Sequence, residues 1–261
     1  MSLVKAKKHL GQHFLTDKNI AQKIVNSLIH TGAYKKVLEV GPGMGVLSDF
    51  LLQKEEYELY MIDIDTESFN FLHKQYPDVG ARLINADFLH LNFKDVFAEP
   101  FAIIGNFPYN ISSQILFKIL ENRQQVPEVV GMFQKEVAER CVAKPGTKAY
   151  GILSVFLQAY YKCEYLFTVK AGVFNPPPKV LSAVIRLSRN ETSTLGCDEK
   201  LFWQVVKAGF NQRRKTLSNA LSGVIPKEKQ DDQEVWNLRA ERLSVQDFVS
   251  LTNDIFNKLK A

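Results

Sequence analysis

VLEVGPGMG, residues 37–45, joins a short apolar run to a turn that contains three glycines. The run VLEV is too apolar for a half-exposed strand and is typical of a strand that is buried on both faces of a parallel sheet. A helical pattern starts at Val46, so the glycines are expected at a strand-to-helix turn. Glycine lets the backbone approach a ligand closely there, and the start of the helix offers unsatisfied amides.

Strand and helix patterns alternate outward from this turn. Apolar runs recur in LYMID (59–63), RLIN (82–85), FAIIG (101–105) and VLSAVIRL (180–187). Helical patterns follow Thr16, a candidate N-cap, and begin again at Thr66 and about Ser112. Such alternation predicts an α/β fold, with a mostly parallel sheet covered by helices on both faces.

The end of the chain has a different pattern. The polar stretch SRNETSTLG (188–196) predicts a linker, and helical spacing follows over 201–221, 232–238 and 245–259. We therefore predict an α/β domain over residues 1–190, which includes a basic leader, and a small helical domain over residues 191–261.

Composition excludes several classes of protein. With 46% hydrophobic and 23% charged residues, the chain of 261 residues is globular. No run approaches eighteen apolar residues, and the first residues lack the apolar core of a signal peptide, so a cytoplasmic protein without a membrane segment is expected. Three scattered cysteines without a CxxC pair or clustered histidines predict neither a disulfide framework nor a metal site.

The net charge of +5 is unevenly distributed. Residues 1–23 contain five lysines against one aspartate, and residues 205–217 contain four basic residues and no acid. Two concentrated basic segments indicate a polyanion partner. On charge alone, two solvated helix faces are an equal alternative.

Two acids after the glycine turn indicate a nucleoside site. The G-x-G-x-G spacing is not that of a dinucleotide fold, and Pro42 removes an amide that a pyrophosphate would use. Asp63 ends the second strand, where a carboxylate can accept both ribose hydroxyls, and Asp87 follows the third strand, where it can accept from an adenine amine. Each acid alone is more often a solvated strand end. Together with Gly41 they resemble the S-adenosylmethionine site of class I methyltransferases.

Residues 106–109, NFPY, follow Gly105 and resemble the Asn/Asp-Pro-Pro-Tyr/Phe box of amino-group methyltransferases, and their chemistry suits a site for an aromatic amine. The side-chain oxygen of Asn106 and the carbonyl of Pro108 can accept the two amine hydrogens and stabilise the positive charge that develops during methylation. Tyr109 offers a face on which a base can stack. The alternative is an ordinary turn that contains Asn and Pro.

Several blocks in order resemble the ribosomal RNA adenine N6-dimethyltransferase family, and most closely its bacterial small-subunit members. They are GQHFL (11–15), EVGPGMG (39–45), GNFPYNIS (105–112), FNPPPKVLSAV (174–184) and FNQRRKTLSNAL (210–221). The resemblance implies a Rossmann-like methyltransferase domain followed by a helical RNA-binding domain. It implies a cofactor site that comprises His13, Leu15, Gly41, Asp63, Asp87 and Asn106. It also implies that Asn106, Pro108 and Tyr109 hold the target adenine, with Phe174 as the opposing aromatic.

Two segments are expected to face RNA. The proline-rich stretch 174–179 is expected to expose Phe174 beside a lysine, although a proline-rich turn before a strand is the stronger explanation when the stretch is taken alone. Arg213, Arg214 and Lys215 would fan around a helix, where a phosphate backbone is a natural partner and a solvated basic helix the alternative.

The resemblance implies an enzyme that dimethylates two adjacent adenosines in a hairpin loop near the 3′ end of small-subunit (16S) RNA. We expect this enzyme to be a monomer and to act on an immature 30S subunit. The alternatives are a large-subunit methyltransferase of the antibiotic-resistance type and an assembly factor without catalysis. Three departures stand out: His13 where many relatives have Asn, Asp63 where many have Glu, and Phe107 where Leu is usual.

Overall fold

The computed structural model describes residues 4–29, 32–192 and 194–260, which form two compact units. The first contains the chain up to Ala138 together with Lys162–Arg189, and the second contains Glu139–Tyr161 together with the residues from Asn190 onward. The predicted single boundary at residue 190 is therefore incomplete, because residues 139–161 join the second unit.

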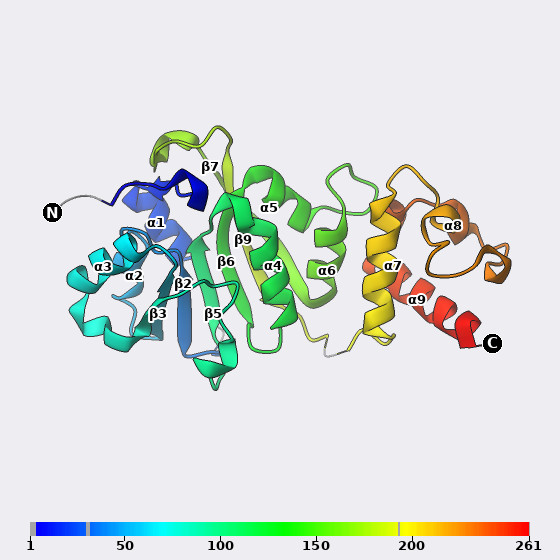
Figure 1. The fold of residues 1–261 in the computed structure, drawn as a ribbon, viewed down its shortest axis with the longest axis horizontal. Coiled ribbons are helices and arrows are strands. Elements are labelled where there is room, and N and C mark those ends of the chain that lie inside the picture. Colours follow the sequence, from blue (N-terminus) through cyan, green and yellow to red (C-terminus); the bar gives the residue numbers. More distant parts are fainter. Residues whose placement is uncertain (1–3, 30–31, 193, 261) are drawn as a thin grey trace. The chain divides into compact units, whose positions relative to one another are not determined.

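A seven-stranded sheet forms the first unit (Figure 1). Its order is β4 (Leu83–Asn85), β3 (Glu58–Asp63), β2 (Lys36–Val40), β5 (Ala102–Asn106), β6 (Glu128–Gln134), β9 (Ser182–Arg189) and β7 (Tyr161–Val169). The five strands from β4 to β6 are parallel, and β9 runs antiparallel to β6. The prediction of a mostly parallel sheet is confirmed, although β6 and β7 were not among the predicted strands.

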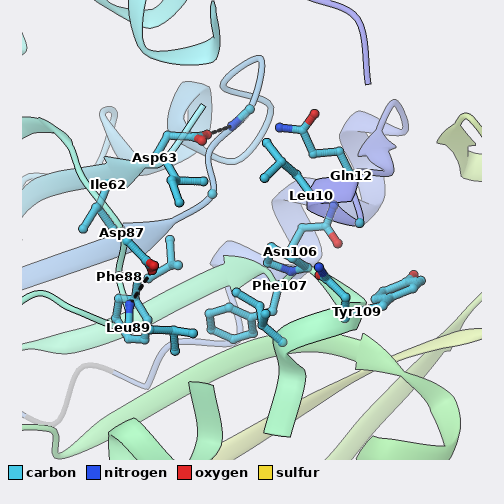
Figure 2. A pocket seen from close by; sticks show the side chains of 18 of the residues that line it. Leu10, Gln12, Ile62, Asp63, Asp87, Phe88, Leu89, Asn106, Phe107 and Tyr109 are labelled. Carbon is cyan, nitrogen blue, oxygen red and sulfur yellow. Dashed lines mark hydrogen bonds between the residues drawn. The ribbon is translucent and has the colours of Figure 1, made fainter. Parts of the chain in front are cut away.

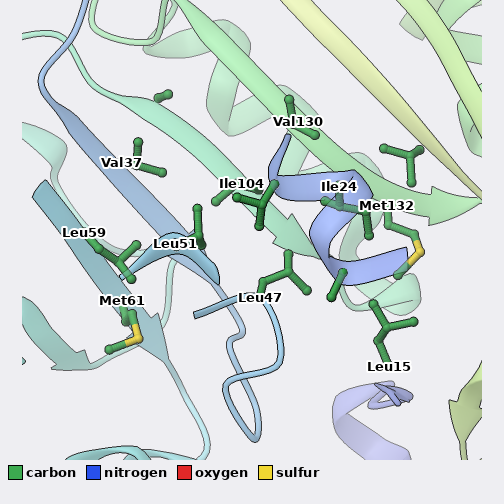
Figure 3. Packing of buried hydrophobic residues seen from close by; sticks show 14 of the residues in the cluster. Leu15, Ile24, Val37, Leu47, Leu51, Leu59, Met61, Ile104, Val130 and Met132 are labelled. Atoms are coloured by element: carbon green, nitrogen blue, oxygen red, sulfur yellow. The ribbon is translucent and has the colours of Figure 1, made fainter. Parts of the chain in front are cut away.

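Helices cover both faces of the sheet. They are α1 (Lys18–Val25), α2 (Ser48–Leu51), α3 (Thr66–Gln75), α4 (Ser112–Glu121) and α5 (Lys135–Val142), the last of which runs into the second unit. Val37 and Ile104 belong to the core cluster that includes α1 and α2 (Figure 3). Their neighbours Leu38 and Ile103 are also fully buried, and neighbouring residues of a strand point to opposite faces.

Two helix starts differ from the prediction. The N-cap of α1 is Asp17, whose carboxylate accepts from the amides of Asn19 and Ile20, while the Thr16 hydroxyl donates to the carbonyl of Val173. The helix expected from Val46 starts at Ser48, because the glycine turn continues to that point. A carboxylate with two amide donors is the stronger cap.

The second unit is helical, as expected. It contains α6 (Ile152–Tyr160), α7 (Glu199–Asn211), α8 (Leu217–Ala220) and α9 (Val245–Lys260). The ring of Phe156 on α6 stacks on Trp203 of α7, with 3.9 Å between centroids, which explains why residues before 190 belong to this unit. The helix predicted over 201–221 is interrupted at Gln212, which has non-helical angles, and the one over 232–238 is a short 3₁₀ turn.

Within the described residues, no helix is long and apolar enough to cross a membrane. The three cysteines form no disulfide. The same part of the chain contains no group of three or more His, Cys, Asp or Glu side chains placed to hold a metal ion.

Candidate active site

A cavity opens at the carboxyl ends of the parallel strands, enclosing about 910 Å³ that is partly open to solvent (Figure 2). Its walls come from residues 10–14, from the turn after β2, and from the ends of β3, β4 and β5. Parallel strands end at one edge, so residues distant in the sequence meet there. The cavity contains seven of the predicted residues: His13, Gly41, Asp63, Asp87, Asn106, Pro108 and Tyr109.

The glycine turn lets a ligand approach the backbone. Gly41 has φ +66°, and a Cβ added there would find nothing closer than Pro108 Cδ at 4.0 Å, so that side of the turn is free space in the cavity wall. Gly43 is also left-handed, but a Cβ there would lie 2.7 Å from the ring of Phe14. Gly41 therefore leaves room for a ligand, whereas Gly43 leaves room for the N-terminal segment.

Asp63 is a buried carboxylate, 5% exposed, in the cavity wall. Its Oδ1 accepts from the amide of Asp65 at 2.8 Å, and its Oδ2 accepts from the amide of Gly43 at 3.2 Å. Burial raises the pKa of Asp63 to about 6, although both amides act in the opposite direction. The two bonds orient the carboxylate and leave further lone pairs for a ligand.

Asp87 lies in the loop after β4. Its Oδ1 accepts from the amide of Leu89 at 2.8 Å, and its Oδ2 accepts from Nδ1 of His90 at 2.9 Å. Lys118 of α4 supports this loop, because its Nζ donates to the carbonyls of Leu89 at 3.0 Å and Leu91 at 2.7 Å. Lys118 is not among the residues predicted from the sequence, because its contacts join segments that are distant in the chain.

Asn106 ends β5 and has a defined orientation. Its Nδ2 donates to the backbone carbonyl of His13 at 2.8 Å, so Oδ1 is the atom available as an acceptor. The predicted second acceptor, the carbonyl of Pro108, also accepts from the amide of Ile111 at 3.3 Å, while the Ser112 hydroxyl divides its one hydrogen between this carbonyl at 3.3 Å and that of Tyr109 at 3.1 Å. These long bonds leave capacity for one more donor.

Tyr109 is held from two directions. Its hydroxyl is hydrogen-bonded to the hydroxyl of Ser182 on β9, and burial raises the pKa of Tyr109. Its ring stacks on that of His13, with centroids 5.4 Å apart and planes at 29°. His13 Nδ1 donates in turn to the carbonyl of Pro176 at 2.7 Å. His13, at a position where many relatives have Asn, thus adds a ring contact with Tyr109.

Packing explains how Phe107 is accommodated at a position where Leu is usual in the family. The ring is 1% exposed and lies 4.9 Å from that of Phe133. It fits because β5 and β6 have glycines beneath it: a Cβ at Gly105 would lie 3.2 Å from the ring, and one at Gly131 would overlap it. The larger side chain thus packs over the two glycines and forms part of the cavity lining.

Phe174 is not an exposed aromatic, so that prediction is wrong. The residue is 4% exposed and pairs with Leu15 across a two-stranded sheet of β1 (Phe14–Leu15) and β8 (Phe174–Asn175). Both residues belong to the core cluster, and neither lines the main cavity. Leu15 lines a smaller cavity beside the glycine turn. Burying the apolar ring in the core gives a lower free energy than leaving it exposed to solvent.

Three further residues near the site were missed. Gln12 and Ile64 line the main cavity, and Ile64 is 52% exposed although it is apolar. Its position directly after the acid that ends β3 is a signal that the sequence offered. Glu39 lines the smaller cavity, where burial raises its pKa to about 8 against the effect of the Ser48 hydroxyl.

The predicted basic cluster of the second unit lies in a turn between α7 and α8 and not on a helix. Arg213 is tied to the backbone, since its guanidinium donates to the carbonyls of Lys148 at 3.0 Å and Tyr150 at 3.1 Å. Arg214 and Lys215 are exposed. The two segments 144–148 and 213–215 thus bring four lysines and arginines besides Arg213 to one region of this unit.

Comparison with known proteins shows close relatives. A family model described as ribosomal RNA adenine dimethylase matches residues 3–260. A protein of Cytophaga hutchinsonii named ribosomal RNA small subunit methyltransferase A is 58% identical over 99% of this chain and 100% of its own length. The protein of the same name from Bacteroides thetaiotaomicron is 54% identical over 100% of this chain and 97% of its own length.

Solved structures agree on the fold. A dimethyladenosine transferase from Plasmodium falciparum superposes with a TM-score of 0.78 at 26% identity, covering 94% of this chain and 98% of the other. The 23S rRNA methyltransferase ErmE superposes with a TM-score of 0.65 at 23% identity, covering 95% and 100%. At that identity the second likeness concerns the fold alone. The predicted Rossmann-like methyltransferase fold is confirmed.

Proposed function

This chain belongs to the ribosomal RNA adenine dimethylase family, and on that premise we propose that it dimethylates N6 of two adjacent adenosines in a hairpin loop near the 3′ end of small-subunit (16S) ribosomal RNA. Methyl groups come from S-adenosylmethionine, the donor used by this family. The observation that supports the proposal most directly is the oriented amide of Asn106 at the edge of a cavity with two carboxylates.

The cavity fits the cofactor. Free space above Gly41 admits a ligand close to the backbone, and the carboxylate of Asp63 can accept from ribose hydroxyls. Asp87 can accept from the adenine amine, and the exposed side chain of Ile64 offers an apolar surface to the base. The backbone near His13 closes the site, and Leu15 holds the neighbouring strand by its burial. The cofactor supplies an electrophilic methyl group on a positively charged sulfur.

The residues at the cavity edge prepare the amine. The lone pair of an adenine amine is delocalised into the ring, which makes the nitrogen a weak nucleophile. Asn106 Oδ1 and the carbonyl of Pro108 accept its two hydrogens and stabilise the positive charge that develops on nitrogen. Tyr109, held by Ser182 and His13, offers a face to the base. The bonding pair of the methyl group would stay on sulfur as a neutral thioether, and the N-methylated adeninium cation is acidic enough to lose its proton to water.

Cofactor affinity is expected to fall as the pH is lowered through about 6. Burial raises the pKa of Asp63 to about 6, against the two amides that favour its charged form. Ribose hydroxyls donate to the carboxylate, so binding is strong above this pKa and weakens below it, where protonation replaces an acceptor by a donor. Calorimetric titration with S-adenosylmethionine from about pH 5 to about pH 8 measures the effect. A pH-independent affinity would contradict this role of Asp63.

Alanine at both Arg214 and Lys215 is expected to weaken RNA binding and to reduce its salt dependence. The two exposed side chains can bind phosphates, and the slope of log K against log salt should fall by up to about 0.9 for each phosphate that is no longer bound. Adding Arg213→Ala also removes two bonds to the loop 148–150, so the pair is the cleaner variant. Filter binding measures the slope, with the exposed Lys200→Ala as control. An unchanged slope would assign these residues to a solvated surface.

The target in the ribosome must be recognised outside the cavity, because Asn106 and Tyr109 contact only the base. We propose that basic surfaces in the leader and in the turn 213–215 supply this recognition, on an immature 30S subunit in the cytoplasm. A rigid subunit offers many phosphates to two basic segments, whereas a short hairpin offers few. We further propose that the enzyme acts as a monomer.

Labelled methyl transfer tests this function. Purified enzyme is mixed with small subunits that lack dimethyladenosine, with the isolated hairpin and with large-subunit RNA, and the modified nucleoside is then identified. We expect efficient dimethylation of the subunits and poor activity on the other two substrates. Faster modification of large-subunit RNA would favour a resistance-type methyltransferase, and no transfer at all would favour an assembly factor.

A further inference from the structure

The N-terminal segment 7–13, here termed the strap, is fixed at its first end to Asp65. Lys7 Nζ lies 2.5 Å from Asp65 Oδ1 and 3.4 Å from a carboxylate oxygen of Glu67. Gln12 Nε2 donates to Asp65 Oδ2 at 3.2 Å, and Gln12 Oε1 accepts from the amide of Lys7 at 2.8 Å. The side chain of Asp65 is 1% exposed. A buried carboxylate therefore receives a cation and an amide from a segment that precedes it by more than fifty residues.

The other end of the strap contacts the reacting groups. The carbonyl of His13 accepts from Asn106 Nδ2 at 2.8 Å, and the His13 ring stacks on Tyr109. Between the ends, Gly11 passes so close to Asn110 that a Cβ there would lie 2.5 Å from its Oδ1, and Asn110 Nδ2 donates to the carbonyl of His9 at 3.3 Å. The strap thus connects the cofactor side of the cavity with the amine side.

The bond from Asn106 to His13 decides which amide atom the substrate meets. A side-chain amide presents an acceptor on one side and two donors on the other. With Nδ2 directed to the His13 carbonyl, Oδ1 remains for the substrate amine. Without that carbonyl the amide can rotate by a half turn and direct N–H groups at the amine, where donor would face donor. The location of the strap therefore affects the chemical step.

We propose that Lys7 and Asp65 are positioning residues for methyl transfer, which hold the strap so that the His13 carbonyl and ring orient Asn106 and Tyr109. This inference rests on the proposed function, because it concerns the step at the amine. Asp65 also fixes the cofactor side: its backbone amide donates to Asp63, and its carboxylate caps α3 through the amide of Glu67 at 3.1 Å. The contact between Lys7 and Asp65 thus supports both the cofactor side and the amine side of the cavity.

Three variants of the full-length protein distinguish the loss of the contact between Lys7 and Asp65 from a general effect of losing a positive charge. Lys7→Met removes the cation and keeps much of the side chain, and Lys7→Arg restores a cation that can reach Asp65. Lys8→Met removes the same charge from the neighbouring exposed position, so any general effect of charge on RNA binding is shared with Lys7→Met. Asp65 itself is not replaced, because it caps α3 and its loss would alter the fold locally.

Hydrogen exchange without cofactor or RNA is the first readout. Amides in residues 8–15 should exchange about tenfold faster in Lys7→Met than in the wild type, and at nearly the wild-type rate in Lys7→Arg and Lys8→Met. The second readout is turnover on small subunits at saturating cofactor and RNA. It should fall about five- to tenfold in Lys7→Met and recover in Lys7→Arg.

Equal hydrogen-exchange rates of residues 8–15 in Lys7→Met and the wild type would contradict the proposal that Lys7 anchors the strap, whatever the turnover of the variant. Faster exchange with wild-type turnover would overturn the positioning role. Equal losses of turnover in Lys7→Met and Lys8→Met would attribute the effect to charge and would also overturn it. Inactivity of the wild-type enzyme on small subunits would contradict the proposed function, and the exchange comparison, made without substrate, remains a separate test of the anchor.

Discussion

Replacing Asn106 by alanine is expected to lower the rate of methyl transfer by roughly two to three powers of ten. The variant lacks Oδ1 of Asn106, the proposed acceptor for the amine. We expect the hydrogen bond between them to be strongest as positive charge develops on the amine nitrogen. RNA affinity should barely change, because binding of the RNA depends mainly on surfaces outside the cavity. Single-turnover methylation with saturating cofactor measures the rate directly.

A control separates this effect from a loss of folding. Asn122→Ala removes another asparagine whose side chain donates to a backbone carbonyl, that of Lys118, but it lies outside the cavity. Its turnover should remain close to that of the wild type. Near-normal single-turnover methylation by a folded Asn106→Ala protein would remove Asn106 from the chemical step.

The second large effect is expected for Asp63→Ala, which should weaken S-adenosylmethionine binding by about 1.5–3 kcal/mol, or roughly ten- to a hundredfold. In the proposed complex, the two ribose hydroxyls would lose their charged acceptor. The backbone amides of Gly43 and Asp65 also lose a partner, so the glycine turn loosens as well. Isothermal titration calorimetry measures the affinity.

The exposed Asp78→Ala is the matched control, because it removes an acid of the same unit that lies outside the cavity. It should bind the cofactor as the wild type does. Calorimetry that shows equal affinities for Asp63→Ala and Asp78→Ala, with both proteins folded, would exclude Asp63 from the cofactor site.

Patterns along the chain predicted three of the strands whose ends contribute residues to the site. Apolar runs at 37–40, 59–63 and 101–105 correspond to β2, β3 and β5. Helical spacing was less reliable for the second unit, where the pattern over 201–221 continues through a break at Gln212. Periodicity reports which side chains can be buried and does not report where the backbone leaves the helix.

The sequence by itself determined that Gly41, Asp63, Asp87 and Asn106 would meet, because the ends of parallel strands lie at one edge of a sheet. It also predicted the chemistry that we propose for those residues. These conclusions need only the order of the elements and the residue that ends each strand.

The tertiary structure alone decided which partners these groups have. It placed Phe174 in the core beside Leu15, tied Arg213 to a distant loop, and brought Lys7 to Asp65 across 58 positions of the chain. Burial and ion pairing depend on segments far away in the sequence, and a local pattern contains no information about them. The physical reason is that a side chain's environment is a property of the packed chain, whereas its periodicity is a property of its neighbours.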